Sequence, residues 1–162
     1  MDKPNGYRRK AGRPLSVTLL ALLLGFGALV GAPSAIAAGD GTYCGHRVLG
    51  EIDAKYRSMG DTRSPLGCPT SDELTNPDRY GKQSQFGERG VIHWSGRTGA
   101  HPVWGGIRDY WCAFKCEAGK FKYPTSDETQ LPNSRGTIYR QNFQCGTIQW
   151  QAGWPTWTYI CD

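Results

Sequence analysis

The longest apolar run of the chain lies near its N-terminus. A basic, polar segment (1–14) precedes the apolar stretch Leu15–Val30, and an Ala-Ile-Ala tripeptide occupies 35–37. These are the three parts of an export signal, so we expect residues 1–37 to form a signal peptide that is cleaved before Ala38. A retained membrane anchor is the alternative, because the run approaches spanning length. The glycines and the proline that interrupt it, together with the cleavage tripeptide, favour removal.

Beyond this segment, the apolar positions follow short helix and strand periods. Ile52, Tyr56 and Met59 share one face of a helix over 51–59, which Gly60 ends. Short runs of β-branched and aromatic residues, bounded by glycines and polar turns, predict strands. These runs lie at 46–48, 91–95, 146–150 and 156–160, and one further possible strand within 81–90 leads to Phe86. The pattern therefore predicts an α+β, β-rich fold in which short helices alternate with β-hairpins.

The chain repeats itself at an offset of 55 residues. Pro69–Glu73 recurs unchanged as Pro124–Glu128, and Gly90–Trp94 aligns with Gly146–Trp150 at an offset of 56. Five identities in a row, with matches on both sides, indicate an internal repeat. The expected organisation is a signal peptide (1–37), a lead-in (38–45), a first repeat (46–100) and a second repeat that ends in an aromatic cap (101–162).

The first repeat carries a full series of short motifs, of which the second repeat, lacking a segment like 98–107, carries only a part. Leu-Gly-Cys-Pro at 66–69 precedes Thr-Ser, and the strand 90–94 and the segment 98–107 (TGAHPVWGGI) follow. This series resembles the LGFP repeat of actinobacterial cell-envelope proteins. Cys68 stands at the usual Phe position, and Phe-Lys-Tyr-Pro at 121–124 replaces the tetrapeptide in the second repeat. The resemblance implies an extracytoplasmic module that binds or organises envelope polysaccharide, with units that look like propeller blades.

The formal net charge of +5 belongs largely to the export segment. Five of the 19 basic side chains precede residue 38, but only one of the 14 acidic ones does, which leaves 14 basic and 13 acidic groups in the rest of the chain. A nearly neutral chain lacks the electrostatic bias of a polyanion binder, so no nucleic acid is expected as a partner. No other apolar run is long enough to span a bilayer, so no membrane association is expected after cleavage.

All the cysteines follow the expected cleavage point. An even number in an exported chain predicts disulfides rather than nucleophiles or metal ligands, although the Cys112/Cys116 spacing also suits a metal. A hairpin centred on Gly153 places Cys145 opposite Cys161, within disulfide distance, and the other pairings remain open. The remaining aliphatic side chains are few, so disulfides and aromatic packing are expected to hold the fold together. The six cysteines are Cys44, Cys68, Cys112, Cys116, Cys145 and Cys161.

Patterns typical of catalysis are absent from the sequence, which has no GxSxG and no HExxH motif. His46 and His101 hold equivalent repeat positions, which predicts one structural hydrogen bond made twice. His93 aligns with Gln149 and is expected to be an exposed strand residue. We therefore expect no enzyme activity, no cofactor and no metal site. The acidic pairs that follow Pro-Thr-Ser are expected in turns rather than in acid–base catalysis: Asp72-Glu73 and Asp127-Glu128.

Aromatic side chains are the best candidates for binding. Trp94 and Trp150 are repeat equivalents and are expected in the core. An exposed ring can stack on a sugar or anchor a protein partner, although core packing is an equal alternative for each tryptophan. The candidate binding residues are Trp104, Trp111, Trp154, Trp157 and Tyr159.

Two functions follow from these features. The first is a secreted, non-catalytic module that binds cell-wall or envelope polysaccharide and lies outside the cell, in the medium or on the wall. The alternative is an adaptor or structural subunit that links other proteins in a secreted complex, with an antibacterial complex as one case. The partner is thus an envelope glycan or another secreted protein.

Overall fold

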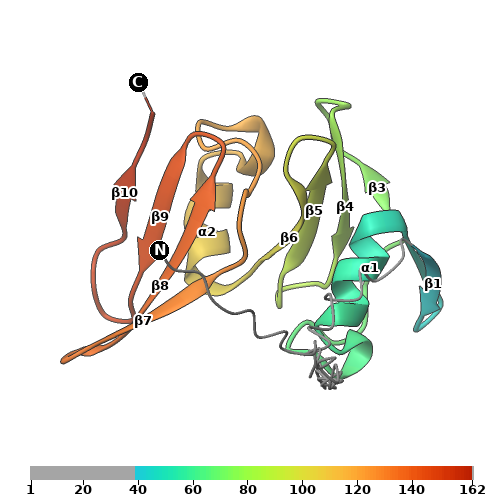
Figure 1. Cartoon of the computed structure of the whole chain (residues 1–162), viewed down its shortest axis with the longest axis horizontal. Coiled ribbons are helices and arrows are strands. Elements are labelled where there is room, and N and C mark those ends of the chain that lie inside the picture. Colours follow the sequence, from blue (N-terminus) through green and yellow to red (C-terminus); the bar gives the residue numbers. More distant parts are fainter. Residues whose placement is uncertain (1–38, 162) are drawn as a thin grey trace, which may run out of the picture. The chain divides into compact units, whose positions relative to one another are not determined.

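The computed structural model describes residues 39–161. The export-signal prediction concerns residues outside this range and stays a prediction. The described part consists of two halves that share a helix, a 3₁₀ turn and four strands in the same order, and the first half has an additional N-terminal hairpin. We call them the first half (39–104) and the second half (105–161) (Figure 1).

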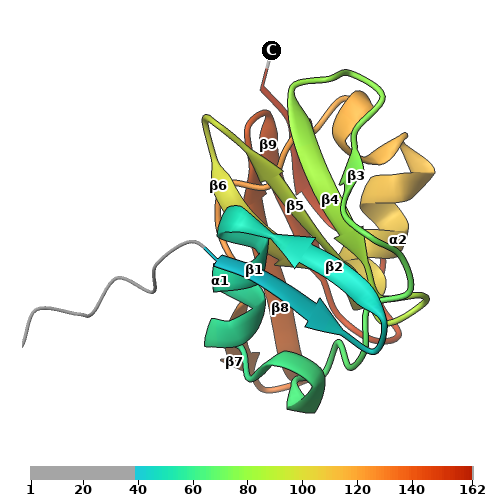
Figure 2. The ribbon, with the colours of Figure 1, turned by 90° about the vertical axis from the view of Figure 1, so that its right-hand side faces the viewer.

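The first half begins with a hairpin and a helix that pack on a four-stranded antiparallel sheet of order β3-β4-β5-β6. Helix α1 contacts β5 and β6, so it covers one face of this sheet (Figure 2). Its elements are β1 (Gly39–Tyr43), β2 (His46–Leu49), α1 (Gly50–Ser58), a 3₁₀ turn (Asp61–Arg63), β3 (Leu74–Thr75), β4 (Gly81–Gln85), β5 (Val91–Ser95) and β6 (Gly99–Val103).

The second half repeats the helix and the four-stranded antiparallel sheet, now of order β10-β9-β8-β7. Strand β10 pairs with β9 as β6 pairs with β5, so β10 is the structural counterpart of β6. The aromatic end of the chain thus completes the second sheet. Its elements are α2 (Gly105–Ala113), a 3₁₀ turn (Cys116–Ala118), β7 (Thr129–Asn133), β8 (Gly136–Phe143), β9 (Gly146–Trp150) and β10 (Trp157–Tyr159).

Two hydrophobic clusters hold the halves, and strand β5 contributes to both. Ile92 joins Val48, Ile52 and Tyr56 in the first cluster, beneath α1. Val91 faces the other way and joins the second cluster, which contains α2 and β9 side chains. Both faces of β5 are therefore buried, and the second half packs directly against the first sheet.

The predicted β-rich α+β class is confirmed, with three disulfides within residues 39–161. The two sheets do not form a propeller in the part of the chain that the structure describes, so the propeller-blade expectation is not confirmed. Cysteine 44 pairs with Cys68, Cys112 with Cys116, and Cys145 with Cys161. The last pair follows from a hairpin register that sets Trp157 opposite Gln149, centred on Gly153 as the sequence predicted.

Candidate functional site

A shallow hollow of about 290 Å³ lies on the outer face of the C-terminal sheet. Trp157 and Tyr159 project from the same face of β10, because residues two apart in a strand share a face. Across the ladder, Trp157 lies opposite Gln149, and Gln149 lies opposite Arg140. We call this surface the aromatic platform and define it by Arg140, Thr147, Gln149, Trp157 and Tyr159.

The platform combines exposed rings with hydrogen-bonding side chains. Trp157 is 44 % exposed and Tyr159 is 71 % exposed, so both rings are open to a ligand. Arg140 and Gln149 supply donors at one end, and the Thr147 hydroxyl, which donates to Asn142 Oδ1 at 3.0 Å, lies beside Tyr159. Flat rings with a few fixed polar groups are typical of surfaces that bind sugars through stacking and hydrogen bonds.

Comparison of the two halves explains why this face is open. Thr147 and Gln149 on β9 correspond to Val91 and His93 on β5. In the first half that face is buried by the second half, whereas in the second half the corresponding residues are partly exposed. The platform is therefore the counterpart, in the second half, of the sheet face that is buried in the first half.

The platform brings together two of the five predicted binding residues. Trp154 lies in the turn before β10, 43 % exposed, with the Arg135 guanidinium 4.9 Å from its ring centroid. Trp104 is partly buried against the first cluster, and its indole hydrogen-bonds Glu128. Neither residue lines the platform.

Of the two alternatives for Trp111, ligand contact and core packing, the structure shows core packing. Its side chain is fully buried, its ring lies 5.4 Å from that of Phe143, and its indole nitrogen donates to Lys122 O at 3.1 Å. The ring occupies the centre of the second cluster because α2 packs against both sheets. No face of this indole is available for stacking.

The expectation that His93 is exposed is wrong, because the second half covers its side of β5. The His93 ring is 2 % exposed and packs edge-on against Trp111. Asn76 Nδ2 donates to both His93 Nδ1 at 3.3 Å and the Tyr123 hydroxyl at 3.0 Å, and Tyr123 donates in turn to Asp78 at 2.8 Å. Burial lowers the pKa of His93 to about 3.

This polar chain lies beside a larger pocket of about 630 Å³ between the halves, which Asp78, Glu117 and Tyr123 help to line. Glu117 is buried, which raises the pKa of its carboxyl group, and one of its oxygens lies 3.9 Å from His93 Nε2. Burial also raises the pKa of the Tyr123 hydroxyl. These groups join the two halves through hydrogen bonds, and they account for the burial of a histidine that the sequence pattern placed at the surface.

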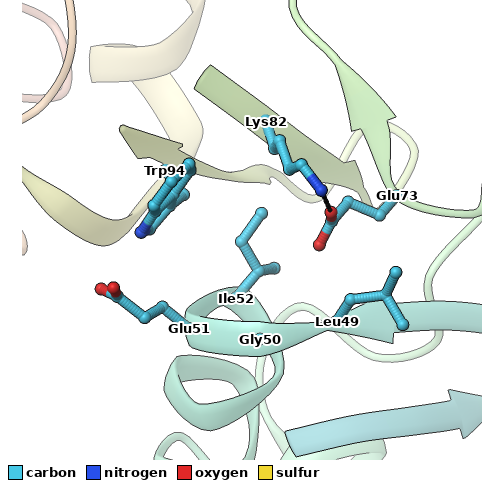
Figure 3. Close-up of a pocket in the computed structure, with 7 residues that line it drawn as sticks. All are labelled: Leu49, Gly50, Glu51, Ile52, Glu73, Lys82 and Trp94. Carbon is cyan, nitrogen blue, oxygen red and sulfur yellow. Dashed lines mark ion pairs between the residues drawn. The ribbon is translucent and has the colours of Figure 1, made fainter. Parts of the chain in front are cut away.

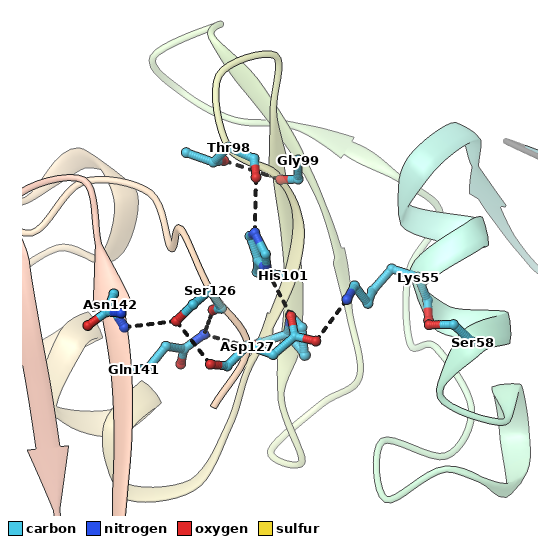
Figure 4. A network of polar contacts seen from close by, with 10 residues as sticks. Lys55, Ser58, Thr98, Gly99, His101, Ser126, Asp127, Gln141 and Asn142 are labelled. Carbon is cyan, nitrogen blue, oxygen red and sulfur yellow. Dashed lines mark hydrogen bonds and ion pairs between the residues drawn. The ribbon is translucent and has the colours of Figure 1, made fainter. Parts of the chain in front are cut away.

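The predicted duplicate histidine contact is present. His46 Nδ1 lies 3.4 Å from Asp72, and His101 Nδ1 lies 2.7 Å from Asp127. The Asp72 carboxylate also accepts the Arg47 backbone N–H, which lowers its pKa. Lys55 on α1 also reaches Asp127, at 2.8 Å, so Asp127 contacts two residues of the first half, His101 and Lys55 (Figure 4).

Within residues 39–161 the structure contains no cluster of three or more His, Cys, Asp or Glu side chains that could hold a metal ion. Over the same range, no helix has both the length and the apolar character needed to cross a membrane. The Cys112/Cys116 pair, which also suited a metal by its spacing, is joined as a disulfide.

These features define a β-rich, disulfide-linked protein built from a helix-and-sheet unit present twice. The LGFP repeat family model matches residues 66–119, so this part of the chain is an LGFP repeat, as its motifs predicted. The match runs from Leu66 through α2 to Gly119 and therefore includes the junction of the two halves. No curated protein matches the chain. LGFP repeats and disulfides are typical of extracellular proteins.

Sequence reasoning missed the polar members of the platform. Alternation in Gly146–Trp150 places Thr147 and Gln149 on the face opposite the buried Ile148, and the hairpin symmetry sets Gln149 beside Trp157. Both signals are present in the sequence. Arg140 could not be found this way, because its place depends on the β8–β9 register.

Proposed function

We propose that the chain is a secreted, non-catalytic module that binds envelope polysaccharide on the aromatic platform. The observation that carries the proposal is the row of Trp157, Gln149 and Arg140 across three strands, with Tyr159 beside it. A pyranose ring can stack on an exposed aromatic face while its hydroxyls bond to the neighbouring amide and guanidinium groups. In this proposal residues 1–37 are removed on export.

The platform is shallow, so one site is expected to bind a sugar unit with a dissociation constant on the order of 1 mM, or about −4 kcal/mol. A polysaccharide presents many such units, and repeated engagement raises the apparent affinity without any new contact. Retention on an insoluble polysaccharide is therefore a more sensitive measurement than titration with a monosaccharide.

The test measures retention of the purified mature protein on insoluble envelope polysaccharide. Trp157→Ala is expected to lower the affinity about tenfold, because loss of one stacked ring costs about 1.4 kcal/mol. Tyr80→Ala is the matched control, since Tyr80 is 80 % exposed but lies outside the platform. Equal retention of both variants, or no retention of the wild-type protein, contradicts the proposal.

The second candidate function is an adaptor that binds another secreted protein through the same face. It is favoured by the correspondence between the platform and the face of the first half that the second half covers, because a protein segment buries that equivalent face. Affinity purification from native culture medium, followed by mass spectrometry, distinguishes the two. A stoichiometric protein partner that Trp157→Ala releases supports the adaptor, whereas a solitary protein chain excludes it.

A further inference from the structure

A separate pocket of about 270 Å³ lies at the N-terminal end of α1, against the first sheet (Figure 3). Trp94 forms one wall, the ion-paired Glu73 and Lys82 form the opposite wall, and Ile52 lies between them. We call it the α1 pocket. The side chains that line it are those of Leu49, Glu51, Ile52, Glu73, Lys82 and Trp94.

The charges of the α1 pocket do not cancel. Lys82 Nζ lies 2.8 Å from Glu73 Oε1, so these two groups neutralise each other. Glu51 is exposed and makes no hydrogen bond or ion pair with the part of the chain that the structure describes. The pocket therefore carries one uncompensated negative charge, at the end where Glu51 and the Trp94 indole nitrogen lie (Figure 3).

The Trp94 ring also lacks the contacts that its counterpart has. Its indole nitrogen is buried and has no hydrogen-bond partner among the described residues. In the second half the Trp150 ring lies directly against Gly106, where a β-carbon would clash with it. Glu51 takes the place of Gly106 in the first half, so Trp94 faces an open space instead of the helix backbone.

A second substitution keeps this space open. Just before α2, the indole of Trp104 hydrogen-bonds Glu128 of the second half, so the chain itself satisfies the carboxylate. The counterparts in the first half are Leu49 and Glu73, and leucine cannot donate a hydrogen bond. The space beside Trp94 in the first half is therefore open, whereas the rings of Trp104 and Trp150 fill the corresponding space beside α2.

The size and lining of the α1 pocket indicate one ring as its ligand. Drug-sized ligands occupy pockets of about 300–1,000 Å³, so a pocket of about 270 Å³ suits a smaller molecule. We propose that it binds a single pyranose unit bearing an amino group, with the ring against Trp94 and the ammonium facing Glu51. The inference takes its ligand class from the proposed function, but it concerns a different site.

The experiment follows the Trp94 indole N–H signal by NMR, assigned through its loss in Trp94→Phe. Glucosamine, glucose and glucuronate are added separately at about pH 6, where an amine is protonated. Glucosamine is expected to shift the signal with a dissociation constant on the order of 1 mM. Glucose is expected to bind about fivefold more weakly, because an exposed ion pair adds little, and glucuronate is expected to have no effect.

Two variants test the assignment to this pocket. Glu51→Gln should reduce glucosamine binding to the level of glucose, whereas Glu88→Gln, an exposed control outside the pocket, should leave it unchanged. Leu49→Trp should fill the space and abolish the shift for every sugar. Dispersed amide signals confirm that each variant is folded. If Leu49→Trp does not fold, the comparison of glucosamine binding between wild type and Glu51→Gln is sufficient to test the proposal.

The inference is overturned if glucuronate binds as well as glucosamine, or if Glu51→Gln has no effect. It is also overturned if N-acetyltryptophanamide shifts the signal and glucosamine does not, since the pocket then takes an aromatic side chain. Polysaccharide retention through Trp157 can succeed while these titrations fail, and the reverse also holds. The two outcomes therefore separate failure of the inference from failure of the proposed function.

Discussion

His93 shows how strongly one buried side chain depends on its neighbours. Its Nδ1 accepts from Asn76, so the neutral ring carries its proton on Nε2, on the side of Glu117. Desolvation holds the ring neutral, and the hydrogen-bonded chain through Tyr123 to Asp78 is built for that state. A proton added to His93 would place a charge in the interior between the halves, where it is costly.

We predict that acid weakens the fold through His93. Unfolded histidine binds a proton below about pH 6.5, but the folded ring has a pKa of about 3, so stability is lost as the pH falls from the first value toward the second. The slope of the unfolding free energy should reach about 1.4 kcal/mol per pH unit. Urea unfolding over this range checks the wild type against His93→Gln, which carries the residue found at the equivalent position in the second half.

Glu117 opposes this effect, because its raised pKa favours the folded state at low pH and weakens it as the pH rises above the ordinary carboxyl value. Glu117→Gln should therefore steepen the acid loss, and Asp78 and Arg108, whose charges also act on His93, stay unchanged in both variants. Identical slopes for wild type and His93→Gln would contradict the prediction.

Strand β10 is a short edge element that carries the two platform rings. It pairs only with β9, over three residues, and the Cys145–Cys161 disulfide closes the hairpin beyond the last pair. Gly146 at the start of β9 has a positive φ and leaves no space for a β-carbon beside the Tyr159 carbonyl. The position of the rings therefore depends on the disulfide as well as on the ladder.

We predict that Cys145→Ser/Cys161→Ser lowers the free energy of unfolding by about 3 kcal/mol, from loop-closure entropy over 16 residues. Amide exchange should rise in β10, and polysaccharide retention should fall with it. The Cys112–Cys116 disulfide closes a loop of only four residues, so its removal in Cys112→Ser/Cys116→Ser should lower the free energy of unfolding by about 2 kcal/mol. Urea unfolding measures both, and unchanged exchange in β10 would show that the ladder alone holds the strand.

Local elements could be predicted from the sequence because their signals are local. The helix expected at 51–59 is found at Gly50–Ser58, and the strand expected at 91–95 is β5. The symmetry of the last hairpin sufficed to pair Cys145 with Cys161. The burial of His93 could not be predicted in this way, since it depends on packing of a segment distant in sequence. The α1 pocket could not be predicted either, since residues distant in sequence, such as Leu49 and Trp94, line it together.

At the scale of the whole molecule, Asp127 connects the second half to the first through two side-chain contacts. It lies in the irregular segment just before β7, in the second half, and accepts contacts from Lys55 on α1 and His101 on β6. His101 Nε2 lies 2.9 Å from the Thr98 carbonyl oxygen, so both ring nitrogens face acceptors. Burial alone would raise the pKa of Asp127, but the hydrogen bonds from His101 and Lys55 outweigh it and hold the pKa below its ordinary value.

We predict that Asp127→Asn lowers the free energy of unfolding by about 0.5–1 kcal/mol, a value reduced by the partial exposure of the carboxylate. Asp72→Asn, the equivalent change, should have a smaller effect, because Asp72 contacts only its own half. The difference should shrink as the pH falls through the lowered pKa of Asp127, where its contribution is lost. Equal losses in urea unfolding at neutral pH would show that Asp127 does not join the halves.

Both faces of β5 are buried, whereas only one face of β9 is. Each sheet therefore has one face covered by its own helix, and its other face can be covered by a neighbouring unit, as happens in the first half. On β9, Thr147 and Gln149 stand where β5 has the buried Val91 and His93, so this face of the second half is partly open to solvent. Packing another unit on it in the same way would bury these two polar side chains, each of which would then need a hydrogen-bond partner.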